Sequence, residues 1–152
     1  MTAVIQRIYS ATVYADGVLS GSVGEGLYIL LGVEKGDTKR DAELLAAKIK
    51  KLRIFCDDNG KMNLSVMDIN GELLVVSNFT LCANYAHGNR PDYMSAAAPD
   101  EANALYECFK ELISLDVKKC ASGVFGADMR TEMSTDGPVT IVMHSSVLGG
   151  KK

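Results

Sequence analysis

Three polar side chains crowd the end of a strongly apolar segment. Ser77, Asn78 and Thr80 follow a run of leucines and valines in the string "LLVVSNFTL". Hydroxyl and amide groups at the exit of a buried strand must be satisfied internally or serve a ligand. These residues are therefore candidates for hydrogen bonding to a polar substrate. The alternative is that they only cap the end of the strand.

Two further segments carry unusual residue combinations. In "GVFGADM", Phe125 stands among glycines, where its ring could belong to the core or form a platform for a ligand. In "STDGPVT", Gly137 and Pro138 weaken a β-like pattern, since proline lacks a backbone N–H and glycine lacks a Cβ. Because Asp136-Gly137 is also a common turn signal, a hairpin turn is the simplest interpretation.

Few residues are available for acid–base or metal chemistry. The two histidines are His87, in a polar loop, and His144, near the end of the sequence. The sequence contains no G-x-S-x-G elbow, H-E-x-x-H, Walker A or G-x-G-x-x-G motif. Its four cysteines form no C-x-x-C pair and have no histidine at ligand spacing. We expect reduced thiols, mostly in the core, and neither metal nor other cofactor.

Composition and charge are those of an ordinary globular protein. With 152 residues, 47% of them hydrophobic, we expect one domain over residues 1–152. The net charge of −3 predicts no general attraction to nucleic acid, so we expect no DNA partner and only local phosphate contacts. No apolar run approaches the roughly 20 residues of a membrane span, and no signal peptide is evident. A cytoplasmic location without a membrane partner is therefore expected.

The spacing of apolar residues predicts a mixed α/β domain. Two short strands are expected in "AVIQRIYSATVYADG" and a buried strand in "GLYILLGVEKGD". A capping-box-like start at Thr38 and apolar residues at helical spacing predict a helix over residues 38–52, and a second helix should follow Pro99.

The remaining segments are predicted to be strands. "MNLSVMDINGELLVVSNFTL" is expected to form a hairpin turning at Asn70-Gly71, with a central second strand, and residues 129–143 a last hairpin. Together these elements predict a largely antiparallel, β-barrel-like sheet with two main helices and a flexible tail from about residue 145.

Taken in order, the segments resemble the D-aminoacyl-tRNA deacylase family over roughly residues 1–143. The strings that carry the resemblance are "AVIQR", "LLGVEKGDT", "LRIF", "GKMNLSV", "VVSNFTL", "RPDY", "GVFGADM" and "DGPVT". The resemblance implies a homodimeric fold. It also implies hydrolysis of the ester that joins a D-amino acid, or glycine, to the 3′ end of tRNA, so the aminoacyl-tRNA acceptor end is the expected partner.

The resemblance gives Gly137 and Pro138 a specific role. Their peptide bond would be cis, and the segment would enter the active site of the partner subunit. There its main-chain carbonyls would accept hydrogen bonds from the substrate ammonium, and the pocket wall would exclude an L side chain. Many D-amino acids would then be accepted, and glycine would also be accepted because it has no side chain to exclude.

The resemblance places catalysis at the strand end. The backbone N–H groups of Phe79 and Thr80, with Ser77 and Asn78 shaping the strand end, would stabilise the oxyanion. The ribose 2′-OH of the terminal adenosine would assist attack by water. A nucleophilic Thr80 is the second interpretation, although no neighbouring base is evident.

Phe125 and Gly123 would contact the terminal adenosine, by stacking and by close backbone approach. Arg7 would support the incoming Gly-Pro segment through its carbonyls. The possible phosphate contacts are Arg90, Lys61 and Lys35.

Two residues depart from the family pattern. Asn78 stands where the family usually has glutamine, and Thr135 where it usually has asparagine. The first exchange shortens a side-chain amide and leaves backbone donors unaffected; the second could loosen the anchor of the Gly-Pro segment. Three alternatives remain: a non-catalytic tRNA-binding module, a related deacylase for L-alanyl-tRNA, and a general esterase.

Overall fold

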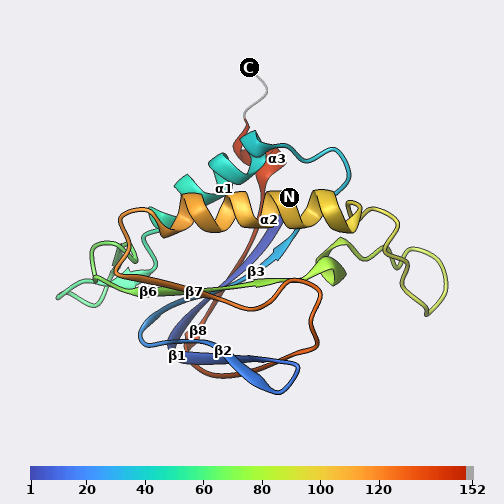
Figure 1. Cartoon of the computed structure of the whole chain (residues 1–152). Helices are drawn as coiled ribbons and strands as arrows, with labels where there is room; N and C mark the ends of the chain where they lie inside the picture. Colours follow the sequence, from blue (N-terminus) through green and yellow to red (C-terminus); the bar gives the residue numbers. More distant parts are fainter. Residues whose placement is uncertain (150–152) are drawn as a thin grey trace.

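Two helices, α1 (Lys39–Lys50) and α2 (Pro99–Ser114), lie across one face of a strongly bent sheet (Figure 1). The computed structural model describes residues 1–149. The strands are β1 (Thr2–Ala15), β2 (Val18–Val23), β3 (Gly26–Gly32), β4 (Phe55–Cys56), β5 (Met62–Leu64), β6 (Glu72–Ser77), β7 (Lys119–Ser122) and β8 (Met129–His144). The two shorter helices are the 3₁₀ helix η1 (Phe79–Cys82) and α3 (Ser145–Leu148).

The long strand β1 organises the sheet. Its first half pairs antiparallel with β3 and its second half with β2, while β8 runs antiparallel along its other edge. From β3 the sheet continues through β6 and β7 in parallel pairing. Parallel neighbours place the C-terminal ends of β3 and β6 side by side, which is where the polar cluster of the sequence lies.

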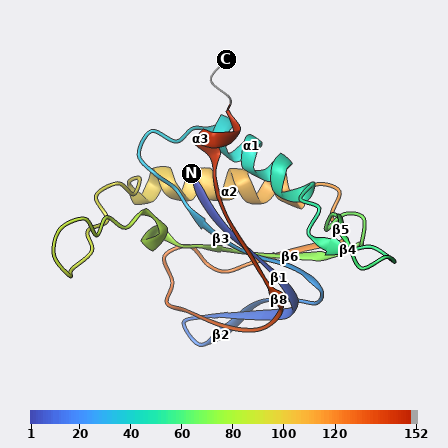
Figure 2. The ribbon, with the colours of Figure 1, turned by 180° about the vertical axis from the view of Figure 1, so that it is seen from behind.

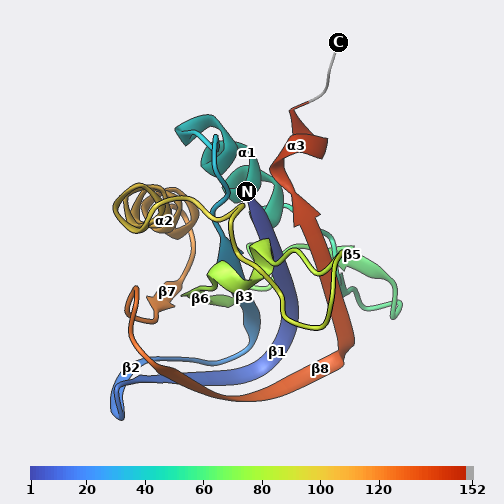
Figure 3. The same cartoon turned by 90° about the vertical axis from the view of Figure 1, so that its right-hand side faces the viewer.

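The sheet closes almost completely on itself (Figure 3). Strand β2 returns toward β7, where the Ser20 hydroxyl donates a hydrogen bond of 2.9 Å to the Ser122 carbonyl. A Cβ added to Gly21 would lie 3.0 Å from the Ala121 Cβ, so the two strands approach closely at this point. The result is a nearly closed barrel with β8 at its free edge.

Local sequence signals explain both long helices. Thr38 precedes α1, and its backbone N–H donates to the Asp41 carboxylate at 2.8 Å, as a capping box requires. Pro99 occupies the first turn of α2, where its missing N–H costs nothing. Both helices bury one face against the sheet. The helix predicted over residues 38–52 is confirmed to within two residues of each end, and the predicted start of the second helix at Pro99 is confirmed.

Two apolar cores result. The larger one fills the space between the helices and the sheet and includes Leu45, Ile49, Tyr106, Phe109 and Ile113 from the helices. The smaller one fills the barrel interior and consists of Ile8, Ala11, Val13, Val23, Tyr28, Leu74 and Val76. None of the helices formed by residues 1–149 has the length and apolar character needed to cross a membrane.

The predicted hairpin at Asn70-Gly71 is wrong. Asn70 does make a tight turn, with φ of 52°. However, β5 pairs with β4, and β6 pairs in parallel with β3 and β7. Between β5 and β6, the Gly71 N–H closes a turn on the Val66 carbonyl at 2.8 Å. The asparagine–glycine signal marks the turn and does not decide which strands it joins.

Three smaller differences concern the ends of the chain and the thiols. The two short strands expected near the start are one strand, β1, and the expected last hairpin is one long strand, β8. The sequence suggested a flexible tail from about residue 145. Residues 145–148 form α3, and Ser145 is buried. Residues 150–152 of this tail lie outside the described part of the chain. The four cysteines are free thiols, and Cys56 is exposed rather than in the core.

Candidate active site

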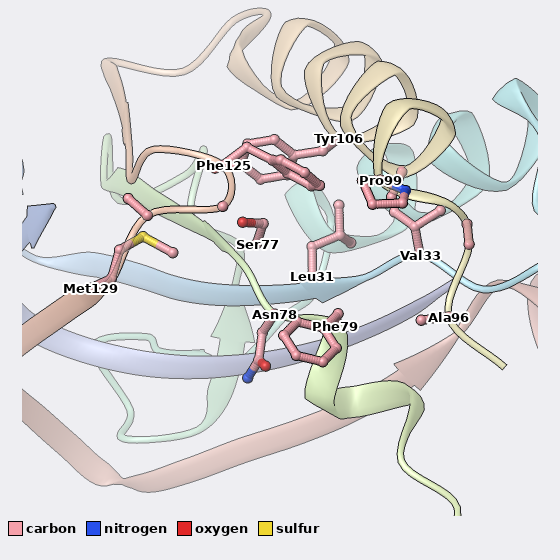
Figure 4. Close-up of a pocket in the computed structure, with 14 residues that line it drawn as sticks. Leu31, Val33, Ser77, Asn78, Phe79, Ala96, Pro99, Tyr106, Phe125 and Met129 are labelled. Carbon is pink, nitrogen blue, oxygen red and sulfur yellow. The ribbon is translucent and has the colours of Figure 1, made fainter. Parts of the chain in front are cut away.

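A cavity of about 450 Å³ opens where β3 and β6 end beneath α2 (Figure 4). Parallel pairing aligns Leu31 with Ser77 at the ends of these two strands. The lining is predominantly apolar and consists of Leu31, Val33, Ser77, Asn78, Phe79, Ala96, Ala97, Pro99, Ala102, Tyr106, Phe125, Gly126, Ala127 and Met129. Such a volume and lining are typical of a small-molecule site.

The polar strand end turns directly into η1. The Asn78 N–H donates to the Leu31 carbonyl at 2.8 Å, the last backbone bond between this segment and β3. The Asn78 side-chain oxygen then accepts the Thr80 N–H at 3.1 Å and also the Thr80 hydroxyl. Asn78 is thus the N-cap of η1, and its side chain satisfies groups of its own chain.

This capping leaves one backbone donor free. The Thr80 N–H is engaged by Asn78, whereas the Phe79 N–H has no hydrogen-bond partner among residues 1–149. The Thr80 hydroxyl donates to an amide oxygen, which cannot accept its proton as a base would. Of the two predicted backbone donors, Phe79 is therefore the one available to a ligand.

Two aromatic rings form the inner wall of the cavity. The Phe125 and Tyr106 centroids lie 5.9 Å apart, with their planes inclined by 44°. The Tyr106 hydroxyl donates to the Val75 carbonyl at 3.0 Å. Burial is the main cause that raises the pKa of Tyr106 well above its ordinary value, so its hydroxyl stays protonated. Tyr106 therefore acts as a wall and not as a base.

Gly123 allows the Phe125 loop to lie close to the start of β8. A Cβ at Gly123 would be 2.4 Å from the Met129 sulfur, so the Met129 side chain would have to shift to make room for it. The Gly123 N–H donates to the Val75 carbonyl at 3.0 Å. Gly123 thus supports the position of Phe125 and does not itself line the cavity.

Among residues 1–149, no histidine, cysteine, carboxylate, lysine or arginine side chain lines the cavity. His144 Nδ1 lies 2.9 Å from the Thr2 hydroxyl, on the free edge of the sheet, and His87 is in an exposed loop. Within residues 1–149, no group of three His, Cys, Asp or Glu side chains is placed to hold a metal ion. The hydroxyl groups among the described lining residues belong to Ser77 and Tyr106.

Gly137 and Pro138 lie elsewhere, in a wide bulge of β8. Gln6 pairs with Thr140 and Ile8 pairs with Thr135, so four residues of β8 stand opposite Arg7 alone. Within this bulge the Gly137–Pro138 peptide bond is cis, and Gly137 has a φ of 126°, which favours glycine. Both residues are exposed, and neither lines the cavity of its own chain.

Arg7 holds the bulge through the residue before Gly137. Its Nη2 donates to Asp136 Oδ1 at 3.1 Å, and its Nε lies 2.7 Å from Oδ2 without a well-aligned hydrogen bond. Its Nη1 donates to the Ile54 carbonyl at 2.6 Å. Within one chain, Arg7 therefore contacts the Asp136 side chain. Its support of the Gly-Pro carbonyls of a partner subunit stays a prediction.

Sequence reasoning missed Asp136, Tyr106 and Met129 as site residues. In the sequence, Asp136 belongs to a common turn signal, and Tyr106 is one of the apolar residues at helical spacing after Pro99. A tyrosine on a buried helical face needs a partner for its hydroxyl, and that requirement was the available signal. Met129 carries no signal, because it reaches the cavity only through the tertiary position of β8.

The predicted phosphate contacts separate into two groups. The Lys35 N–H donates to the Ser95 carbonyl at 2.9 Å, so Lys35 adjoins the exposed loop that carries Arg90. Lys61 lies in the turn between β4 and β5, at the other end of the molecule (Figure 2). Lys35 and Arg90 thus belong to one region of the surface, and Lys61 lies away from it.

Comparison with known proteins gives matches along nearly the whole chain. Residues 4–144 match the family model described as D-Tyr-tRNA(Tyr) deacylase. Proteins named D-aminoacyl-tRNA deacylase from Geobacter sulfurreducens and Geotalea daltonii are each 52% identical over 145 residues. The alignments cover 95% of this chain in both cases, and 95% and 97% of the relatives.

Solved structures show the same fold. The protein titled c-Myc DNA Unwinding Element Binding Protein superposes with a TM-score of 0.89 at 37% identity, over 95% of this chain and 98% of the other. A probable eukaryotic D-amino acid tRNA deacylase superposes with a TM-score of 0.79 at 15% identity, over 94% and 99%. With a family model matched over residues 4–144 and relatives about half identical, this chain belongs to the D-Tyr-tRNA(Tyr) deacylase family.

Proposed function

We propose that this protein hydrolyses the ester bond of D-aminoacyl-tRNA, releasing the free D-amino acid and tRNA. Beside family membership, one structural observation carries the proposal. Within the described part of the chain, the Phe79 N–H is unpaired and stands at an apolar cavity whose wall has no nucleophile and base together. Such a site suits a substrate that brings a reactive ester and part of the catalytic machinery with it.

The terminal adenosine of the tRNA is the part of the substrate that fits the cavity. Its base is flat and apolar on both faces, and the Phe125 and Tyr106 rings offer a wall on which it can stack. A volume of about 450 Å³ accommodates a nucleoside. The ester on the ribose then lies toward the strand end, near Phe79.

The reaction proceeds by attack of water on the ester carbonyl. A C–O bond to water forms, the carbonyl oxygen becomes an oxyanion, and the bond to the ribose oxygen breaks as that oxygen takes up a proton. The Phe79 N–H donates to the oxyanion, an interaction worth about 3–4 kcal/mol when well placed. Because the wall offers no base, the ribose 2′-OH of the substrate assists the proton transfer.

Selection for the D enantiomer comes from the Gly137-Pro138 segment of a partner subunit. Main-chain carbonyls accept hydrogen bonds from the substrate ammonium, which fixes both the ammonium and the ester carbon. A D side chain then points outward, and an L side chain would meet the pocket wall. The exposure of both residues in one chain supports this role, because it leaves them free to contact a second copy.

Glycine has no side chain to exclude, so glycyl-tRNA, including glycine mischarged on tRNA(Ala), is also a substrate. Discrimination between D and L residues is a steric effect, whereas acceptance of glycine follows from the absence of any clash. The enzyme should accordingly accept D-amino acids with side chains of many sizes.

A deacylation assay tests the proposal. D-Tyrosyl-tRNA and glycyl-tRNA should lose their amino acid in the presence of enzyme, and a simple chromogenic ester should not be cleaved. D-Tyrosyl-tRNA that ends in 2′-deoxyadenosine should react far more slowly. Binding of tRNA without hydrolysis would contradict the proposed activity, and unchanged cleavage of the deoxy substrate would contradict the assistance by the 2′-OH.

A further inference from the structure

The loop of residues 84–94, hereafter the 84–94 loop, has a defined shape although it is exposed. Asn84 and Asp92 exchange two backbone hydrogen bonds, of 2.8 and 2.9 Å. The Asn84 side chain accepts the Ala86 N–H at 3.1 Å, and the Asp92 side chain accepts the Met94 N–H at 3.1 Å. Side chains on this loop are thus presented from a folded support.

This loop is continuous with the cavity. The Tyr93 ring meets the Phe79 ring at a centroid distance of 5.1 Å, with planes at 74°, and Phe79 lines the cavity. Beyond the loop the chain enters α2 through Ala96 and Pro99, which also line the cavity. A chain-like ligand that leaves the cavity past Phe79 would therefore pass over the loop.

The loop presents large apolar side chains to solvent. Tyr85 is 79% exposed and Met94 is 71% exposed. Neither side chain is covered by the described residues of its own chain. An exposed aromatic ring on a loop that adjoins such a pocket is the kind of platform on which single-stranded bases stack.

Two cations at the loop offer contacts for a phosphate backbone. Arg90 lies in the loop, and Lys35 adjoins it through the bond to Ser95. In the described part of the chain, no carboxylate lies within ion-pair distance of either cation. The loop carries one acid, Asp92, and one of its oxygens is engaged by the Met94 N–H.

We propose that the 84–94 loop binds the single-stranded nucleotides that precede the terminal adenosine, with Tyr85 stacking on a base and Arg90 and Lys35 contacting phosphates. This inference rests on the proposed function, since the adenosine in the cavity directs the preceding nucleotides past Phe79. It assigns recognition of the RNA strand to residues outside the reacting centre.

Replacement of Tyr85 tests the stacking. Tyr85→Ala should lower kcat/KM for D-tyrosyl-tRNA by roughly 5- to 150-fold, the loss expected for one stacked base, through a higher KM with little change in kcat. Tyr85→Phe keeps the ring and should retain nearly all of the activity. Because Tyr85 is exposed, both variants should fold as the original protein does.

The salt dependence of tRNA binding tests the cations. Each lost contact with a single-strand phosphate should reduce the slope of log K against log salt by about 0.7. Arg90→Ala and Lys35→Ala should each show this reduction. Lys51→Ala is the matched control, because Lys51 is exposed at the C-terminal end of α1, away from the loop, and should leave the slope unchanged.

The outcomes separate this inference from the proposed function. If the unmodified protein fails to hydrolyse D-tyrosyl-tRNA, the function itself is wrong. If it hydrolyses the substrate and Tyr85→Ala does so with equal kcat/KM, the 84–94 loop does not bind the strand. A change of oligomeric state on Tyr85→Ala, measured by sedimentation, would assign the loop to a protein interface instead.

Discussion

Both carboxylate oxygens of Asp136 face the guanidinium of Arg7. The Nη2–Oδ1 distance is 3.1 Å and the Nε–Oδ2 distance is 2.7 Å. Arg7 is the single β1 residue opposite the four-residue bulge of β8, and Asp136 immediately precedes Gly137 in that bulge. The pair therefore ties the Gly-Pro segment to the centre of the sheet by a side-chain contact. Asp136 also raises the pKa of the exposed Tyr9 hydroxyl, through a side-chain hydrogen bond and its charge.

Removing the charge of Asp136 should weaken both the fold and the reaction. Asp136→Asn leaves the buried Arg7 without its anion, and breaking such a pair costs about 3 kcal/mol in the free energy of unfolding. The value of kcat/KM for D-tyrosyl-tRNA should fall because the bulge loses its anchor. Urea unfolding and deacylation kinetics measure the two effects.

The matched control for Asp136→Asn is Glu132→Gln, which breaks the exposed pair between Glu132 and Arg130. An exposed pair contributes less than about 1 kcal/mol, so stability should hardly change. Equal unfolding free energies for the two variants would show that the Arg7–Asp136 contact does not anchor the bulge.

Filling the cavity should block binding of the substrate. Ala102 lines the cavity from α2, so Ala102→Phe places a ring where the adenosine is proposed to lie. We expect KM for D-tyrosyl-tRNA to rise at least tenfold, the equivalent of about 1.4 kcal/mol. Ala104→Phe is the control, because Ala104 lies on the exposed side of the same helix. An unaltered KM for Ala102→Phe would exclude this cavity as the substrate site.

The hydroxyl of Thr80 should be dispensable for the chemistry. Thr80→Val keeps the shape of the side chain and removes only the hydrogen bond to Asn78. One neutral hydrogen bond is worth about 1 kcal/mol, so kcat should fall by less than about tenfold. Loss of a true nucleophile would instead lower kcat by roughly 10⁶-fold. A loss of that size would restore Thr80 as the nucleophile.

Local signals predicted the helices and the polar strand end. The capping box at Thr38 and Pro99 in the first turn of α2 are local features, as is the step from apolar to polar residues after Val76. The strand interior is buried, as its apolar residues suggested, and its polar end lines the cavity. These features depend on neighbouring residues alone, so a single sequence contains them.

Long-range pairing was not predictable in the same way. The Asn70-Gly71 turn and the Asp136-Gly137 turn signal both suggested hairpins, yet β6 pairs with strands remote in sequence and the second signal marks a bulge. The role of Asp136 depends on Arg7, which lies 129 residues away along the chain. Nothing local in either segment specifies that contact.

Glu72 should make the fold sensitive to acid. Its carboxylate accepts the Gly24 N–H at 2.8 Å and pairs with Lys118 at 3.0 Å. Both contacts lower the pKa of Glu72 in the folded state, and the hydrogen bond from Gly24 has the largest effect. Because the pKa of Glu72 is lower in the folded state than in the unfolded state, its ionised carboxylate stabilises the fold. This stabilisation is fully present above the unfolded pKa of 4.5 and is lost as the pH falls through the folded pKa.

Glu72→Gln should therefore be less stable than the original protein at pH 7, by about 1 kcal/mol, and should lose less stability between pH 5 and pH 3. Urea unfolding at a series of pH values measures this difference. Glu111→Gln, at an exposed site on α2, provides the comparison and should leave the pH profile unchanged. Parallel profiles for Glu72→Gln and the original protein would contradict the assignment.

The most direct test of the proposed function is the ratio of single-turnover hydrolysis rates for D-tyrosyl-tRNA and L-tyrosyl-tRNA, measured under identical conditions. If the substrate ammonium is held in a fixed position, an L side chain meets the pocket wall and is excluded. This exclusion predicts a ratio of at least about 100 in favour of the D substrate. A ratio near one would show that the site does not sense the handedness of the amino acid, and it would contradict the account.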